Sequence, residues 1–124
     1  KDLIKIFRTK NSKFEIAIAP HFSEIEEAKK FDVTLITNNN KPLNIMELAG
    51  LIIKSSYVVA NDTGPAHMSA HLGKEGLALF GHHTSPQKVS IETEKFKTLV
   101  VDSLKELSPE LVYSHIKEKL ELIN

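Results

Sequence analysis

The stretch that decides the fold is VVANDTGPAHMSAHLGKEGLALF, residues 58–80. A buried strand is expected over residues 57–60, which include the apolar beginning of this stretch. The polar turn Asn61-Asp62-Thr63-Gly64 follows, and Pro65 suits the first turn of a helix, where its missing N–H costs nothing. A second buried strand is expected over 77–80. Strand, turn, helix and strand in this order predict a parallel βαβ unit.

The same alternation extends in both directions. Further buried strands are expected over 14–19, 33–37 and 98–101. Three helix starts carry an N-cap pattern: Ser23 with Glu26, Asn44 with Glu47, and Ser108 before Pro109. The last helix is expected to bury Leu111, Val112, Ile116 and Leu120. The chain is therefore predicted to be α/β, with a parallel sheet flanked by helices in a single domain over residues 1–124.

Composition excludes several classes of function. The 124 residues weigh 13.9 kDa, and 16 basic residues balance 16 acidic ones, so no net field recruits nucleic acid or anionic lipid. The absence of cysteine excludes disulfides, thiolate metal sites and a cysteine nucleophile. No Gly-x-Ser-x-Gly, Walker A or Gly-x-Gly-x-x-Gly pattern is present, which argues against common hydrolases, P-loop enzymes and dinucleotide-dependent dehydrogenases.

The turn at residues 61–64 is the candidate binding site. It places the Thr63 and Gly64 amides at a helix N-terminus, beyond the carboxyl end of a parallel strand, where open α/β sheets bind ligands. Free N–H groups and the helix dipole favour a phosphate there. Gly64 lets an anion approach the backbone, Thr63 adds a hydroxyl, and His67 lies within reach. The same residues also make a good turn without any ligand, so this spacing alone leaves both interpretations open.

Histidine spacing raises the question of a metal site. His67 and His71 are four residues apart on one helical face, and His82 and His83 follow the next strand. The glutamate of a zinc-protease helix is missing between the first pair, and no third ligand is assured. No metal site is therefore predicted.

The ordered motifs Asn-Asp-Thr-Gly-Pro-Ala-His (61–67), Leu-Gly (72–73), Leu-Ala-Leu-Phe-Gly (77–81) and Thr-Ser-Pro (84–86) resemble the heptosyltransferases, glycosyltransferase family 9. Weaker similarity extends over 14–107. The resemblance implies the C-terminal, donor-binding half of a GT-B enzyme with Rossmann-like domains. It further implies inverting sugar transfer without a metal or other cofactor, from a nucleotide-sugar such as ADP-heptose to a lipopolysaccharide-core acceptor. Such enzymes act in the cytoplasm, with possible peripheral association at the inner membrane.

The resemblance also assigns donor-binding roles. Asp62, Thr63, Gly64 and His67 match the family's donor motif, with the two central residues holding the diphosphate. Leu43 falls where the family contacts adenine. The segment after Pro20-His21 contains two candidates for the glutamate that binds ribose, Glu24 and Glu26. For each of them, an exposed helix residue without a ligand role is an equally good interpretation.

Some features depart from the family pattern. His82-His83 adds a residue to one loop, and Lys74-Glu75 replaces the usual proline after Leu-Gly. The family's first donor-domain strand and its whole N-terminal domain have no counterpart, so the chain is expected to be a C-terminal fragment. The catalytic base and acceptor site are then expected in the missing domain, with no catalytic residue here. A stand-alone nucleotide- or phosphate-binding module and a GT-B epimerase are the alternatives.

Overall fold

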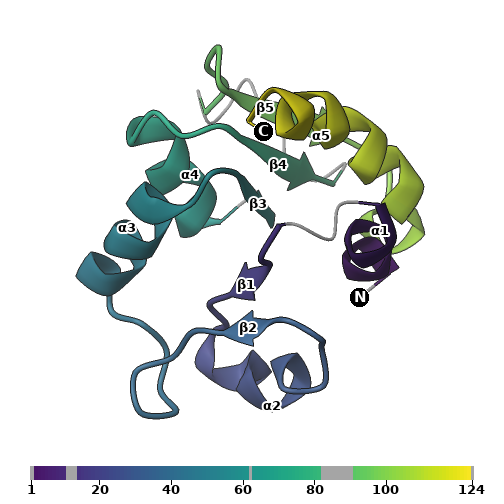
Figure 1. The fold of residues 1–124 in the computed structure, drawn as a ribbon. Helices are drawn as coiled ribbons and strands as arrows, with labels where there is room; N and C mark the ends of the chain where they lie inside the picture. The colour runs from purple at the N-terminus through teal and green to yellow at the C-terminus, as the bar shows by residue number, and fades with distance from the viewer. Residues whose placement is uncertain (1, 11–13, 62, 82–90, 124) are drawn as a thin grey trace. The chain divides into compact units, whose positions relative to one another are not determined.

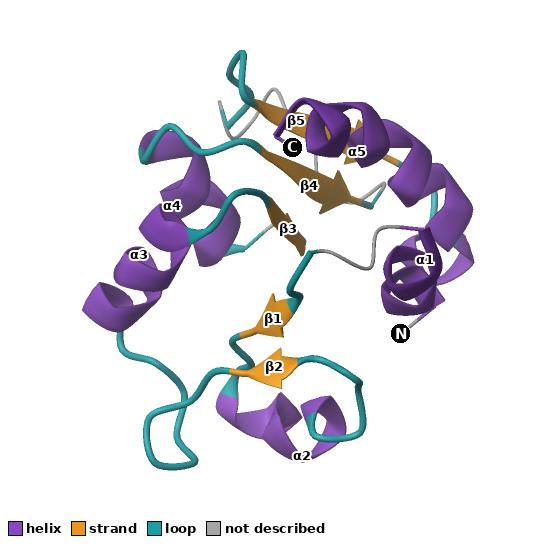
Figure 2. Ribbon diagram, viewed as in Figure 1, coloured by secondary structure: helices purple, strands orange, loops and turns teal. Residues whose placement is uncertain are grey.

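A computed structural model describes residues 2–10, 14–61, 63–81 and 91–123. The structure is α/β, with parallel sheets flanked by helices as predicted, which agrees with a Rossmann-like half of a GT-B enzyme (Figures 1 and 2). It consists of two compact units, Lys1–Leu48 and Ala49–Asn124, and each unit is described by itself.

The first unit has a two-stranded parallel sheet. Its elements are α1 (Asp2–Lys10), β1 (Ala17–Ile18), η1 (Phe22–Glu24), α2 (Ile25–Ala28), β2 (Thr34–Leu35) and the beginning of α3 (Ile45–Lys54). Strand β1 pairs with β2 in the register Ala17–Thr34 and Ile18–Leu35. Ile25 and Ala28, at the two ends of α2, are buried, so this short helix contributes the buried apolar side chains of the connection between the strands.

The second unit has a three-stranded parallel sheet in the order β3-β4-β5. Its elements are the rest of α3, β3 (Val58–Asn61), α4 (Gly64–His71), β4 (Gly76–Phe80), β5 (Phe96–Val100), η3 (Leu104–Glu106) and α5 (Pro109–Ile123). Since all three strands run in one direction, their carboxyl ends lie at the same edge. Helix α4 begins at this edge, directly after β3 (Figure 1).

The core of the second unit lies between α4 and the sheet. It contains small residues of α4 and β4 together with larger apolar side chains: Ala66, Ala70, Ala78, Phe80, Ile91 and Phe96. Ser69 of α4 is also fully buried, and its hydroxyl donates to the carbonyl of Pro65 at 2.7 Å. Small side chains let a helix lie close to a sheet, and this fixes α4, and therefore its N-terminus, relative to β3.

The end of α4 explains the Leu-Gly motif. The amide of Gly73 donates to the carbonyl of Ala70, and that of Lys74 to the carbonyl of Ser69, each at 3.1 Å. With a φ of 73° at Gly73, these bonds form a Schellman motif, in which glycine accepts the left-handed conformation without strain. The Lys74 ammonium donates to the carbonyl of Ile53 at 3.0 Å, so it satisfies a carbonyl near the end of α3.

Two of the three predicted N-caps are confirmed. Asn44 and Glu47 form a reciprocal capping box, and the Ser108 hydroxyl accepts the Leu111 amide at 3.3 Å. The capping box at Ser23 is wrong, because Ser23 lies inside η1 and makes no cap bond. Its hydroxyl instead lies 3.3 Å from the His21 ring.

Two further details differ from the predictions. Strands β1 and β2 are shorter than the apolar runs 14–19 and 33–37. In α5, Val112 and Ile116 are buried as expected, whereas Leu111 is 42 % exposed; the side chain of Leu120 lies outside the described residues. None of the helices in the described residues has both the length and the apolarity needed to cross a bilayer.

Candidate functional site

The N-terminus of α4 has the geometry expected of an anion site. Thr63 is the N-cap, in an extended conformation, and its carbonyl accepts the amides of Ala66 at 3.1 Å and His67 at 3.3 Å. Pro65 has no N–H to donate. Among the described residues, the amides of Thr63 and Gly64 therefore have no acceptor. Two adjacent amides at the positive end of a helix dipole are suited to bind phosphate oxygens.

The threonine hydroxyl is not used to cap the helix. Thr63 Oγ1 donates to the carbonyl of Asn61 at 3.3 Å, a long bond. This carbonyl lies at the end of β3. The exposed hydroxyl is thus held at the same edge of the sheet as the two amides, and a phosphate oxygen is a stronger acceptor with which it can exchange that bond.

Gly64 is not required by the fold. Its backbone is not in the left-handed region, and apart from its chain neighbours and the backbone of its own helix, no atom of the described residues lies within 4 Å of a Cβ built on it. Gly76 in β4 is the opposite case, because its Cβ would overlap the Phe96 ring and lie 2.6 Å from the Val58 carbonyl oxygen. Glycine at position 76 is therefore required by packing, whereas the open space at the Cβ position of Gly64 leaves room for a ligand close to this backbone.

The structure places some of the other expected donor residues near this end of α4. His67 is half-buried in the first turns of the helix, four residues after the N-cap. Asp62 lies outside the described residues, as do His82 and His83. Within the described part of the chain, no group of three or more His, Cys, Asp or Glu side chains is arranged to hold a metal ion.

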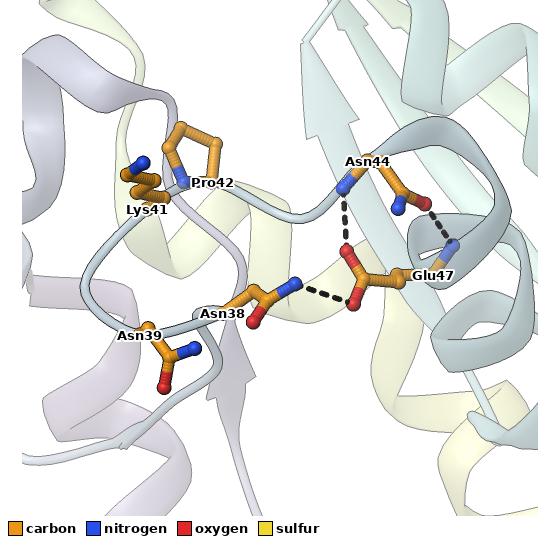
Figure 3. A pocket seen from close by; sticks show the side chains of 6 residues that line it. All are labelled: Asn38, Asn39, Lys41, Pro42, Asn44 and Glu47. Atoms are coloured by element: carbon orange, nitrogen blue, oxygen red, sulfur yellow. Dashed lines mark hydrogen bonds between the residues drawn. The ribbon is translucent and has the colours of Figure 1, made fainter.

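The first unit contains a polar cavity next to Leu43. The cavity has a volume of about 300 Å³ and lies where a tight turn leads into α3 (Figure 3). It is lined by Asn38, Asn39, Lys41, Pro42, Asn44 and Glu47. Leu43 itself is half-buried and lies between Pro42 and the N-cap residue of α3. The predicted adenine contact is thus part of a segment with a cavity beside it.

The two alternatives for the ribose-binding glutamate differ in their surroundings. Glu26 is paired at 3.0 Å with Lys29, the C-cap residue of α2. Glu24 ends η1, is exposed, and makes no side-chain hydrogen bond or ion pair with the described part of the chain. A carboxylate that is already paired must exchange its partner to accept another donor, so Glu24 is the less constrained of the two carboxylates.

The opposite edge of the three-stranded sheet has a different electrostatic character. Tyr57 precedes β3 and Glu75 precedes β4, and the Glu75 carbonyl accepts the Val58 amide at 3.1 Å. Burial, and secondarily the negative charge of Glu75, raise the pKa of the Tyr57 hydroxyl far above its usual range. One oxygen of Glu75 is buried without a hydrogen-bond partner in the described residues. Tyr57 and Glu75 therefore lie where the strands begin, whereas α4 starts beyond the carboxyl end of β3.

The predicted residues are divided between the two units, and their arrangement differs within each unit. The second unit places Thr63, Gly64 and His67 on one helix end. The first unit holds Leu43, Glu24 and Glu26 on separate segments. The contact between Asn38 and Glu47 in the cavity wall, at 2.9 Å, is not predicted by the sequence. The run of asparagines at 38–40 marks a turn, yet no local pattern indicates which side chain the first of them binds.

Comparison with known proteins identifies the family. Searches of curated proteins and of solved structures returned no match. A family model, described as glycosyltransferase family 9 (heptosyltransferase), matches residues 6–120. This match covers nearly the whole chain, including both the α4 N-terminus and the cavity beside Leu43. The chain therefore belongs to glycosyltransferase family 9, the heptosyltransferase family.

Proposed function

We propose that this chain supplies the donor-binding part of an inverting, metal-independent glycosyltransferase. The observation that carries the proposal is the pair of amides of Thr63 and Gly64 at the start of α4, for which the described residues provide no acceptor, in a chain that belongs to a glycosyltransferase family. In this proposal the amides bind the diphosphate of a nucleotide-sugar, with ADP-heptose as the expected donor.

The chemistry follows from what sugar transfer demands. When the bond between the anomeric carbon and the diphosphate breaks, negative charge grows on the leaving phosphate oxygen. Fixed donors directed at that oxygen stabilise the transition state more than the ground state. The Thr63 and Gly64 amides are such donors, since the packing of α4 holds them in place before the substrate arrives. His67 adds a further donor from the same helix, and Asp62 is assigned to the sugar or to ordering the turn.

The nucleoside part of the donor is assigned to the first unit. Leu43 is proposed to contact the base, and Glu24, with its carboxylate unpaired in the described structure, is proposed to accept the ribose hydroxyls. Glu26 is the weaker assignment because Lys29 already binds it. Two ribose hydroxyls directed at one carboxylate make charge-assisted hydrogen bonds, which are stronger than neutral ones.

The remaining parts of the proposal come from the family. A separate acceptor domain is proposed to supply the catalytic base and to bind a lipopolysaccharide-core acceptor. The reaction is then proposed to occur in the cytoplasm, at the inner face of the inner membrane. No residue of this chain is proposed to take a proton from the acceptor.

Calorimetric titration of the full-length protein with ADP, UDP and GDP, with and without magnesium, tests the proposal. We expect saturable binding of ADP that does not depend on magnesium and is lost in Gly64→Val, because the valine side chain fills the open space at the amide. Equal ADP affinity in wild type and Gly64→Val would refute the diphosphate site. A strict requirement for magnesium would refute the metal-independent mechanism.

A further inference from the structure

Glu47 connects a turn to the start of a helix. Its carboxylate accepts the side-chain amide of Asn38 through Oε2 at 2.9 Å and the backbone amide of Asn44 through Oε1 at 2.9 Å. Its own backbone amide donates to Asn44 Oδ1 at 2.8 Å. Figure 3 shows these three bonds at the wall of the cavity. One exposed carboxylate therefore joins two segments, with the partner Asn38 nine residues away in sequence.

The turn that Glu47 holds is already rigid. Asn38 and Lys41 exchange two backbone hydrogen bonds, at 2.8 and 3.0 Å, around Asn39 and Asn40. Both central residues have positive φ, 52° and 66°. This is the geometry of a two-residue hairpin turn of type I′, in which asparagine tolerates the left-handed conformation better than most residues.

The chain between the two fixed points is very short. Only Pro42 and Leu43 separate the turn from the N-cap Asn44. The ring of Pro42 fixes its φ. With the turn closed, the helix capped and Glu47 joining the two, few conformations remain for the residue assigned to the base.

The same bonds set the orientation of two amides in the cavity wall. Asn38 donates to Glu47 through Nδ2, so its Oδ1 is left as an acceptor, and Asn44 accepts through Oδ1, so its Nδ2 is left as a donor. Both residues line the cavity. The edge of a nucleobase presents donors and acceptors side by side, and a fixed donor and acceptor are suited to contact it.

We propose that Glu47 is a positioning residue that holds the segment 38–44 in the conformation that contacts the nucleobase of the donor. This inference rests on the proposed function. Glu47 acts through Leu43 and the two asparagine amides and does not itself touch the diphosphate. Its loss therefore weakens recognition of the nucleoside and leaves recognition of the diphosphate unchanged.

Glu47→Gln distinguishes the bond from Asn38 from the capping box with Asn44. Glutamine at the third position of a helix keeps the capping box with Asn44, but its N–H₂ group then faces the Asn38 amide. Asn38 loses its acceptor and can keep the contact only by turning its amide over, which directs Nδ2 instead of Oδ1 to the cavity. If the segment then occupies its binding conformation about a tenth of the time, affinity falls about tenfold. The matched control is Glu27→Gln, which removes an equivalent exposed helix carboxylate, one paired with Lys30 at 3.3 Å.

The experiment compares ADP with inorganic pyrophosphate by calorimetry on the full-length protein. We expect Glu47→Gln to weaken ADP about tenfold, leave pyrophosphate affinity unchanged and leave the melting temperature near that of Glu27→Gln. Asn38→Ala should reproduce the loss, and the double variant should be no worse than either, because both changes break one contact.

Each other outcome contradicts a defined claim. Unchanged ADP affinity in Glu47→Gln, or an equal loss for ADP and pyrophosphate, overturns the positioning role while the proposed function stands. Additive losses in the double variant overturn the claim that the two residues act through one contact. Failure of the wild-type protein to bind ADP at all refutes the proposed function, and the inference with it.

Discussion

Gly64 and Gly50 form a matched pair at the scale of single residues. Both lie in helices, and a methyl group at either would meet no described atom within 4 Å beyond its chain neighbours and its own helix backbone. Alanine at the interior position of α3, Gly50→Ala, should raise the free energy of unfolding by about 0.5–1 kcal/mol. Gly64→Ala should leave stability equal or slightly higher, yet weaken ADP binding at least about tenfold, because the methyl group occupies the space that a phosphate needs.

Thermal denaturation and ADP titration of both variants check this prediction. Gly50→Ala is the control for the change in backbone freedom, and it should bind ADP like wild type. An ADP affinity of Gly64→Ala equal to that of Gly50→Ala would show that no ligand approaches this amide.

Gly76 should respond in the opposite way. A Cβ at this position would overlap the buried Phe96 ring and crowd the Val58 carbonyl. Gly76→Ala should therefore lower the free energy of unfolding by about 1–3 kcal/mol. Urea denaturation measures this loss. A variant as stable as wild type would mean that β4 and β5 are not packed as described.

The sequence predicted the backbone geometry at the start of α4 well and the contacts around the cavity poorly. Thr63, Gly64 and Pro65 are local signals, because the turn, the cap and the proline act within a few residues of one another. The bond from Asn38 to Glu47 joins residues nine apart. It depends on where the turn directs the chain, and no pattern of the residues themselves encodes that path.

At the scale of secondary structure, the start of a helix was predictable where the capping side chain has no better partner than the backbone amides of that helix. Asn44 with Glu47 meets that condition, whereas Ser23 has the His21 ring as a competing partner and lies inside η1. Strand lengths were overestimated for β1 and β2, because apolar runs extend beyond the residues that find a hydrogen-bonded neighbour. The Val33 amide, for example, donates to the carbonyl of Phe31 in a turn.

The Schellman motif at the end of α4 should make stability sensitive to the residue at position 73. Gly73 has a φ of 73°, where a side chain is strained, so Gly73→Ala should lower the free energy of unfolding by about 1 kcal/mol. Replacement by asparagine, which tolerates this conformation, should cost less than replacement by alanine. Chemical denaturation of the two variants measures the difference. Equal stability of wild type and Gly73→Ala would contradict the left-handed conformation.

The dependence of stability on pH is a prediction for the molecule as a whole. The pKa of Tyr57 is raised in the folded protein, chiefly by burial, whereas in the unfolded chain it is near 10, about the ordinary value for tyrosine. Above pH ~10 the unfolded state therefore binds fewer protons than the folded state, and stability falls as pH rises. Below pH ~10 this contribution is fully present.

Tyr57→Phe isolates this effect. The free energy of unfolding of wild type should fall more steeply between pH ~9.5 and 11 than that of the variant, because only wild type carries the shifted hydroxyl. Urea denaturation across this range gives both slopes. Parallel slopes would show that the Tyr57 hydroxyl titrates equally in both states.

The amides of Thr63 and Gly64 are proposed to bind the diphosphate of the donor. The most direct test is titration of the ¹⁵N-labelled protein with ADP, followed by NMR of the backbone amides. With ADP we expect the largest shifts at Thr63 and Gly64 and a second group of shifts around Leu43, whereas with pyrophosphate we expect only the first group. Saturable ADP binding that leaves the Thr63 and Gly64 amides unshifted would contradict this proposal.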